Sequence, residues 1–485
     1  MINEIIESYF SDAVIESAKK CAQRLIQSLP DQRVIRNNRV LLAYGGGKDS
    51  SYMVAWVIYI RNVVLSERGE TFRLRIITNR HAGMNHKVME NIDNVYRSLG
   101  VYDDDSIECL IADGLLIRPF ERYVVMPEVV KLQNRTNVLM SGHRFQADAR
   151  STFCNACNLS MMNSFGMAAQ LNGGVDVIVT GDSSKEQAAY FAWVRHLSRL
   201  FTTGKLDKAR GFSSFLKTLD SVANGYFESI YGPGNVTSEH RIAYELVGDP
   251  VFFNIYQDTA YDSGDHWELL TEFLGFDFDE LMFSFSESDC GNPTLMAHIR
   301  GLRAETLLGR SYKEGVREYA SFAIGLMKQK DFPLHLISKM AARYENDTAI
   351  NEQRARATKF AIDAYDLSTQ QLICMIYSPF TEGGKNLEEY RAQQNIALPL
   401  PAIHCLLQSN VDGCSILQAK LEQISGLSLE QLRQLYGNCL VASLLESKAD
   451  DPLSRVLRYD PHKAIVQVKN DRSRSGSVVE VISGR

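Results

Sequence analysis

Short apolar runs recur through the first half of the chain, and amphipathic stretches separate them. Apolar positions spaced three and four residues apart predict helices at residues 2–29, 52–60, 85–99 and 155–171. The apolar runs predict strands at residues 40–43, 72–78, 107–111, 175–180 and 251–256. Because strands alternate with helices, we expect an α/β fold with a doubly wound parallel sheet of about five strands.

The pattern becomes helical in the last third of the chain. Apolar spacing of three and four continues at residues 316–327, 334–344, 351–365, 402–408 and 429–445. Short alternating runs close to the end predict a pair of strands. We therefore expect an N-terminal helical segment at 1–39, an α/β domain at 40–305 with an insertion at about 200–245, and a mainly helical domain with short terminal strands at 306–485.

Composition places the chain among ordinary soluble globular proteins. It has 485 residues, of which 45% are hydrophobic and 23% charged, and no run approaches the roughly 20 apolar residues of a membrane span. Acidic residues precede the first basic residue, Lys19, so we expect no signal peptide and no membrane association. Nine cysteines, mostly scattered, favour a reducing, cytoplasmic setting. A net charge of −6 gives no general attraction to nucleic acid.

The strongest chemical signal follows the predicted strand at 40–43. Three glycines, Gly45 to Gly47, are followed by Lys48 and Asp49, then by two hydroxyls, Ser50 and Ser51, at the start of a predicted helix. Glycines let the backbone approach an anion closely, and the first amides of a helix point toward it. We therefore expect a phosphate-binding turn; the alternative is a glycine-rich turn without a ligand.

The spacing differs from the P-loop of kinases and GTPases, which has four residues between its first two glycines. Residues 45–50 instead resemble the Ser-Gly-Gly-x-Asp-Ser loop of the PP-loop ATP pyrophosphatases, also called adenine nucleotide alpha hydrolases, with Gly45 in the usual place of Ser. This resemblance implies a HUP-like fold and cleavage of ATP between the α and β phosphates, with transfer of AMP to an oxygen of the substrate. It covers roughly the first 300 residues and is specific only at this loop.

The resemblance also assigns residues beyond the loop. The segment after the second strand, Thr78 and Asn79, is expected near adenine, mainly through its backbone. A second turn, from Gly181 to Glu186, follows the fourth strand. There Asp182 is expected to bind Mg²⁺ together with Asp49, and Lys185 to contact phosphate or the adenylate. The alternative for this turn is an ordinary N-cap. A late arginine, Arg300 or Arg303, is expected to neutralise pyrophosphate; the alternative is a solvated helix face.

Cys154 and Cys157 are three residues apart at the expected start of a helix. Two thiols at this spacing can reach one metal ion, and Cys290 is the best candidate for a third ligand. The order of motifs is similar to that of PP-loop enzymes that thiolate tRNA, in which such cysteines hold an iron–sulfur cluster or carry sulfur. The alternative is a pair of buried structural thiols. Three further cysteines in apolar stretches are expected in the core: Cys374, Cys405 and Cys439.

The leading hypothesis is an ATP- and Mg²⁺-dependent enzyme that adenylates a carbonyl or carboxylate substrate, after which a nitrogen nucleophile attacks. A nitrile product would be similar to that of the preQ0 synthases of this family, although their terminal zinc-binding cysteines are missing. The second hypothesis is sulfur transfer to tRNA or a small molecule through Cys154 and Cys157, with zinc or an iron–sulfur cluster. The third is a non-catalytic nucleotide-binding subunit whose helical C-terminal half binds a protein partner. These hypotheses have a metabolite, tRNA or a protein as alternative substrates.

Overall fold

The computed structural model describes residues 2–181, 184–201, 211–259, 266–278, 292–329, 332–409, 415–441, 451–459 and 463–483, and only the backbone of 184–191, 193, 415 and 459. The chain divides into two compact units. The first comprises Met1–Pro127, Asn158–Asn224 and Ser238–Glu280. The second comprises Glu128–Cys157, Gly225–Thr237 and Leu281–Arg485. The units are therefore built from interleaved stretches, whereas the sequence pattern suggested consecutive ones.

The first unit contains a six-stranded, mostly parallel sheet, which confirms the predicted α/β class. The sheet order is β4-β3-β2-β1-β5-β6, and only β4 is antiparallel to its neighbour. The strands are β1 (Arg39–Ala43), β2 (Arg73–Arg80), β3 (Ile107–Asp113), β4 (Leu116–Pro119), β5 (Val177–Thr180) and β6 (Val251–Asn254). Five of them match predicted strands; β4 is an addition.

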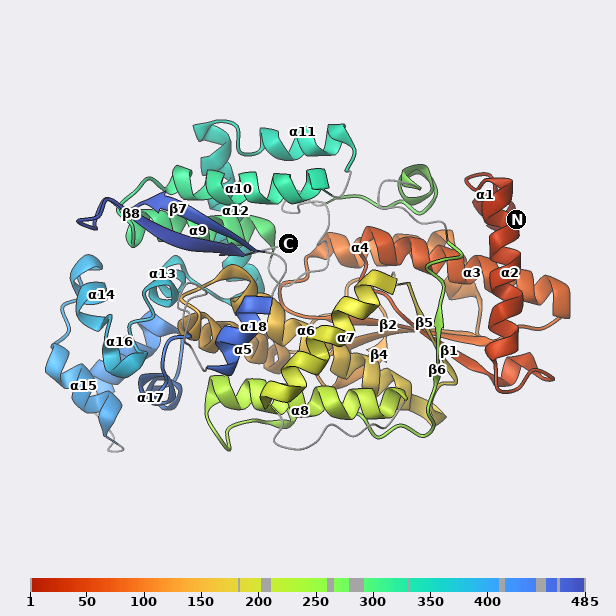
Figure 1. Cartoon of the computed structure of the whole chain (residues 1–485), viewed down its shortest axis with the longest axis horizontal. Coiled ribbons are helices and arrows are strands. Elements are labelled where there is room, and N and C mark those ends of the chain that lie inside the picture. The colour runs from red at the N-terminus through yellow and green to blue at the C-terminus, as the bar shows by residue number, and fades with distance from the viewer. Residues whose placement is uncertain are drawn as a thin grey trace. The chain divides into compact units, whose positions relative to one another are not determined.

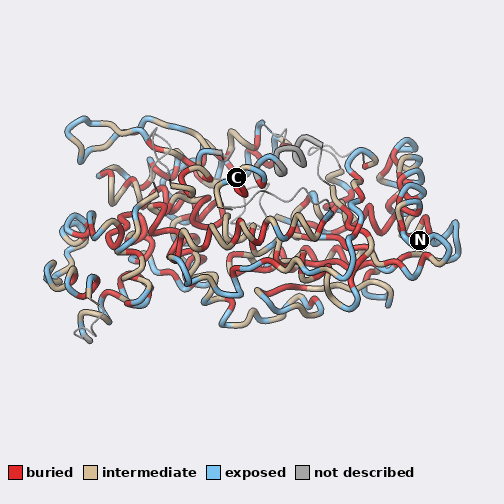
Figure 2. The backbone as a smooth tube through the Cα atoms, turned by 60° about the horizontal axis from the view of Figure 1, so that its bottom comes forward, coloured by how far each residue is buried: buried red, intermediate tan, exposed pale blue. Residues whose placement is uncertain are grey.

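Helices pack on both faces of this sheet. The helices of this unit are α1 (Ile2–Glu7), α2 (Asp12–Ser28), α3 (Lys48–Arg68), α4 (His86–Ser98), the later part of α6 (Ala149–Gln170), α7 (Ser184–Phe201) and most of α8 (Phe212–Tyr231). Figure 1 shows α3 and α4 together on one side of the strands. On the other side, Arg75 and Asn79, at alternate positions of β2, both bond to α6. Buried residues follow the strands through the interior (Figure 2).

The second unit is mostly helical. Its helices are α5 (Glu128–Arg144), the start of α6, α9 (Pro293–Thr306), α10 (Tyr312–Gln329), α11 (Leu334–Ala342), α12 (Asp347–Tyr365), α13 (Thr369–Tyr377), α14 (Leu387–Gln393), α15 (Leu400–Gln408), α16 (Ser415–Ser425), α17 (Leu429–Gly437) and α18 (Pro452–Tyr459). The predicted terminal strands are an antiparallel hairpin, β7 (Lys463–Lys469) and β8 (Ser477–Ser483). Among the described residues, none of the helices is long and apolar enough for a membrane span.

Candidate functional site

The glycine loop connects β1 to α3 at the carboxyl end of the sheet. Gly46 has φ +78°, a conformation that L-residues with a side chain rarely adopt. A Cβ atom on Gly46 would lie 2.6 Å from Val88 Cγ1 and 2.9 Å from Ile92 Cγ1, both on α4. Glycine is therefore required here both by backbone conformation and by the close approach of α4.

Helix α3 begins without a capping side chain. Its N-cap is Gly47, which makes no side-chain cap bond, whereas Asn85 caps α4 by accepting from the amides of Lys87 and Val88. The N-terminal turn of a helix has amides without intrahelical partners, and the helix dipole makes this end favourable for an anion. The start of α3 therefore has the chemistry of an anion-binding turn.

Lys48 and Asp49 are the first two residues of α3, and they differ strongly in exposure. The Lys48 side chain is 3% exposed and its ammonium is ion-paired with the Asp49 carboxylate, whose side chain is 63% exposed. The cation is therefore held close to the loop, and the carboxylate is the group that solvent or a metal ion can reach.

The two serines of the loop stabilise the turn itself. Both hydroxyls donate to the Gly47 carbonyl, at 3.0 Å from Ser50 and 2.9 Å from Ser51. Ser51 is fully buried and also lies 2.9 Å from the Tyr44 hydroxyl, whose pKa is raised by burial and lowered in part by this contact. Ser50 is only partly buried, so it is the more accessible hydroxyl for a ligand.

The end of β2 lies beside the loop, because β1 and β2 pair in parallel. Thr78 donates its hydroxyl to the Tyr44 carbonyl at 2.8 Å, which ties β2 to the start of the loop. The Asn79 amide oxygen accepts from Ser164 at 2.6 Å and from Ser160 at 3.5 Å, both on α6. These two serines were not identified from the sequence. Their spacing of four residues places them on one face of a helix, and this spacing is the signal that could have identified them.

The end of β5 also reaches the start of α3. A Cβ atom on Gly181 would clash with the Met53 side chain, so the turn after β5 packs closely on α3. Asp182 and the Lys185 side chain lie outside the described residues. Their expected roles with Mg²⁺ and phosphate stay predictions.

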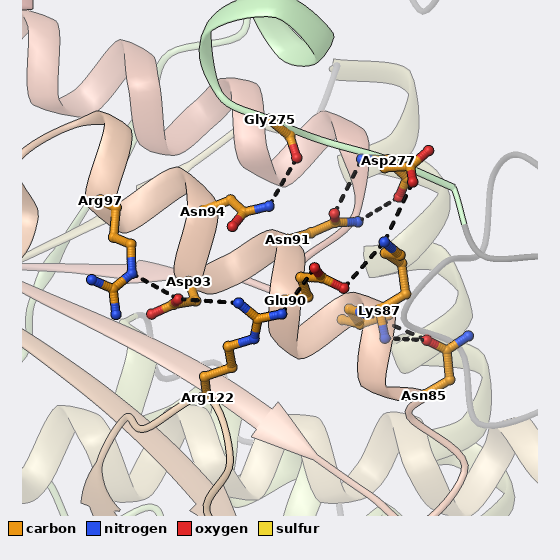
Figure 3. A network of polar contacts seen from close by, with 11 residues as sticks. Asn85, Lys87, Glu90, Asn91, Asp93, Asn94, Arg97, Arg122, Gly275 and Asp277 are labelled. Atoms are coloured by element: carbon orange, nitrogen blue, oxygen red, sulfur yellow. Dashed lines mark hydrogen bonds and ion pairs between the residues drawn. The ribbon is translucent and has the colours of Figure 1, made fainter.

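A polar network holds a distant segment against α4, whose N-terminal half contacts Gly46 (Figure 3). Asn91 and Asp277 exchange two hydrogen bonds: the Asn91 amide donates to the Asp277 carbonyl at 2.8 Å, and the Asp277 amide donates to the Asn91 side chain at 3.1 Å. Lys87 pairs with Glu90 at 3.1 Å and with Asp277 at 3.3 Å. Burial lowers the Lys87 pKa, but these two carboxylates outweigh it, so that the pKa is raised overall. The network therefore holds α4, the helix that packs against Gly46, in place beside the glycine loop.

Arg300 and the cysteines belong to the second unit. The Arg300 guanidinium is ion-paired with Glu318 and Glu480, so it is already neutralised within the protein. Cys154 is buried and Cys157 partly exposed, within α6 rather than at its start, because α6 begins at Ala149. Cys290 lies outside the described residues. Among the residues that the structure describes, no cluster of three or more His, Cys, Asp or Glu side chains is placed to hold a metal ion. Of the three cysteines expected in the core, Cys374 is buried, as predicted, whereas the predictions for Cys405 and Cys439 were wrong because both are exposed.

Comparisons with known protein families, with curated proteins and with solved structures found no match to this chain. The candidate site is therefore defined by its residues and their geometry. It consists of the turn from Gly45 to Ser51, with the ends of β2 and β5 on either side.

Replacing Gly46 with Ala is expected to destabilise the first unit by about 2–5 kcal/mol, because the left-handed backbone costs about 1–2 kcal/mol and the clash with Val88 a further 1–3 kcal/mol. Gly69→Ala is the matched control, since Gly69 has φ +72° but open space around it. Denaturant unfolding of both variants separates the two costs. Equal losses of free energy would show that the contact with α4 is unimportant.

Proposed function

We propose that this chain binds ATP on the turn from Gly45 to Ser51 and transfers AMP to a carbonyl or carboxylate oxygen of a substrate, with release of pyrophosphate. The observation that carries the proposal is the position of the turn in the sheet. β1 lies between β2 and β5, so the strand order reverses direction at the strand that leads into the turn. In open α/β sheets, ligands bind outside the carboxyl ends of the strands at such a reversal.

The local chemistry supports a phosphate ligand. The glycine N-cap leaves the start of α3 without a capping side chain, and the Lys48 ammonium lies directly beside the turn. These are the groups that bind phosphate in other α/β proteins. The likeness of residues 45–50 to the PP-loop then favours ATP among phosphate ligands and cleavage at the α phosphate. On the same likeness we propose that the sheet of the first unit is HUP-like.

The exposed carboxylate of Asp49 fits a role with magnesium. Mg²⁺ is usually bound by one or two carboxylates together with substrate phosphates, and it would neutralise negative charge on the pyrophosphate leaving group. Asp49 is oriented by its ion pair with Lys48 and remains open to solvent. Lys48 would hold the phosphates in position, so that catalysis would depend on placement and charge neutralisation. A nitrogen nucleophile then attacks the activated carbon of the adenylated substrate and AMP leaves, which completes the proposed reaction.

The direct test is a screen for ATP-dependent pyrophosphate release in the presence of Mg²⁺, with metabolite and protein extracts as substrate sources. Calorimetric titration with ATP accompanies it. Absence of both ATP binding and pyrophosphate release in the wild-type protein would refute the proposed function.

Lys48→Met keeps the apolar stem of the side chain but removes its charge. We expect ATP affinity to fall roughly ten- to a hundredfold, since a charge-assisted contact contributes roughly 1.5–3 kcal/mol. Lys20→Met, at an exposed position of α2, is the control and should retain wild-type affinity. Unchanged ATP affinity in Lys48→Met would mean that this ammonium does not contact the phosphates.

A further inference from the structure

Three arginines of the second unit converge on two carboxylates. Arg300 on α9 donates to Glu318 Oε2 from Nε at 2.9 Å and from Nη2 at 2.6 Å, and it also pairs with Glu480. Arg303, one turn further along α9, donates from Nε to Glu480 Oε1 at 2.8 Å. Arg310, in the connection to α10, pairs through Nη2 with Glu318 Oε1 at 2.6 Å.

The arginine donors of this cluster are not all used by its carboxylates. Three guanidinium groups face two largely buried carboxylates, and Glu314 is both 3.8 Å from Arg310 and 47% exposed. The Arg310 side chain is only 7% exposed, yet its Nε and Nη1 have no hydrogen-bond partner in the described part of the chain. Buried donors without partners are costly, so they point to an acceptor that the protein does not itself provide.

One of the two carboxylates comes from the terminal hairpin. Glu480 lies on β8 of the terminal hairpin, which forms a sheet of only two strands beside α9 and α10 (Figure 1). Val468 and Ile482 of the hairpin are buried, but Ile465 and Val479 are exposed. A two-stranded hairpin is marginally stable alone, so its position depends on its contacts with the rest of the unit. These include the ion pairs of Glu480, the bond from the Ser483 hydroxyl to Asp148 and the bond from the Asp471 amide to the Leu308 carbonyl.

Glu480 itself is bound as an anion. Its side chain is 6% exposed, and burial alone would raise its pKa, but Arg303 and Arg300 together lower the pKa below its usual value. The carboxylate thus occupies the position of an anionic ligand between two guanidinium groups. A tetrahedral phosphoryl group offers these groups more acceptor oxygens and more charge than one carboxylate.

We propose that Arg300, Arg303 and Arg310 form a binding site for a phosphoryl group, and that Glu480 is its internal occupant, displaced together with the β7–β8 hairpin when the ligand binds. This site is separate from the proposed ATP site, since it lies wholly in the second unit. Binding of the phosphoryl group would thus release the C-terminal hairpin, a function beyond the ATP chemistry proposed for the first unit.

The first experiment uses the full-length wild-type protein and hydrogen exchange. Inorganic phosphate is compared with glycerol 3-phosphate, and with chloride at matched ionic strength. We expect phosphate or the phosphomonoester to speed amide exchange of residues 463–483 by roughly tenfold, equivalent to one tenfold change in the docking equilibrium. The two ligands distinguish free phosphate from a phosphorylated metabolite. Exchange that responds to neither ligand, or equally to chloride, would overturn the proposal.

Variants test the two halves of the site separately. Glu480→Gln removes the internal competitor and should tighten phosphate binding roughly ten- to a hundredfold, whereas Arg310→Met should weaken it by a similar factor. Asp471→Asn makes the same change in charge on the same hairpin, at an exposed carboxylate paired with Lys469, and should bind phosphate like the wild type.

Glu480→Asp, which keeps the charge on a shorter side chain, replaces Glu480→Gln if that variant does not fold and should show intermediate tightening. Equal tightening in the Glu480 and Asp471 variants, or none in the Glu480 variants, would overturn the proposal.

Discussion

Asp49→Asn is expected to lower the rate of ATP-dependent pyrophosphate release by about 10²–10³-fold, the loss typical when one group that stabilises transition-state charge is removed. Asn has the same shape as Asp, and the side chain is 63% exposed, so folding stability should change by less than about 0.5 kcal/mol. The Lys48 ammonium keeps its charge, so ATP affinity without Mg²⁺ should be unchanged or higher. The expected result is a loss of rate with ATP binding retained.

Calorimetric titration with ATP, with and without Mg²⁺, is measured beside pyrophosphate release. Glu67→Gln, an exposed carboxylate at the other end of α3, is the control and should have wild-type rate and affinity. Lys48→Met should show the opposite pattern, with affinity affected more than rate. A wild-type rate in Asp49→Asn would remove Asp49 from the proposed mechanism.

The sequence predicted the parallel sheet because its strands are short, apolar and buried. The run at 40–43, for example, is part of β1, of which Val40, Leu41 and Leu42 are buried. It did not predict β4, because Leu116–Pro119 is a four-residue edge strand that contains Arg118 and is not buried. The helix predicted at 155–171 begins earlier, at Ala149, because Asp148 precedes it and accepts from the Ser151 amide.

Among the predicted functional residues, those whose surroundings are set by neighbours in the sequence could be predicted, and those whose partners are distant in the sequence could not. The glycine turn is a local feature, since Gly45 to Ser51 are consecutive and lie between one strand and one helix. The partners of Arg300 are not local, since Glu480 is 180 residues away in the sequence and pairs through the docking of the terminal hairpin. The contact of Asn79 with Ser164 likewise depends on how α6 packs on β2, which apolar periodicity does not specify.

Buried histidines make the stability of the second unit sensitive to mild acid. His143 on α5 is fully buried, and neither ring nitrogen has a hydrogen-bond partner among the described residues. Burial lowers its pKa from 6.5 to about 3. His298 on α9, next to Tyr312, has its pKa lowered to about 4 by burial and by the Arg354 charge. Both imidazoles are therefore neutral in the folded protein at pH 5.

In the unfolded chain these histidines take up protons below pH 6.5, so acid favours unfolding. The stability contributed by the neutral form is complete above pH 6.5 and is lost as the pH falls toward the folded-state pKa. Between pH 7.5 and 5, each histidine should reduce the free energy of unfolding by about 2 kcal/mol. Glu480 does not contribute in this window, because its pKa is lowered from 4.5.

His143→Leu should remove about 2 kcal/mol of this pH dependence and stabilise the protein at pH 5, because it replaces a buried imidazole without partners by an apolar side chain of similar size. Urea unfolding at pH 7.5, 6.5, 5.5 and 5.0 measures the effect. His335→Gln removes an exposed imidazole from the same unit and should retain the wild-type pH dependence. If His143→Leu lost stability with acid as steeply as the wild type, His143 would have to be protonated or hydrogen-bonded in the folded protein, contrary to its buried and unpaired position.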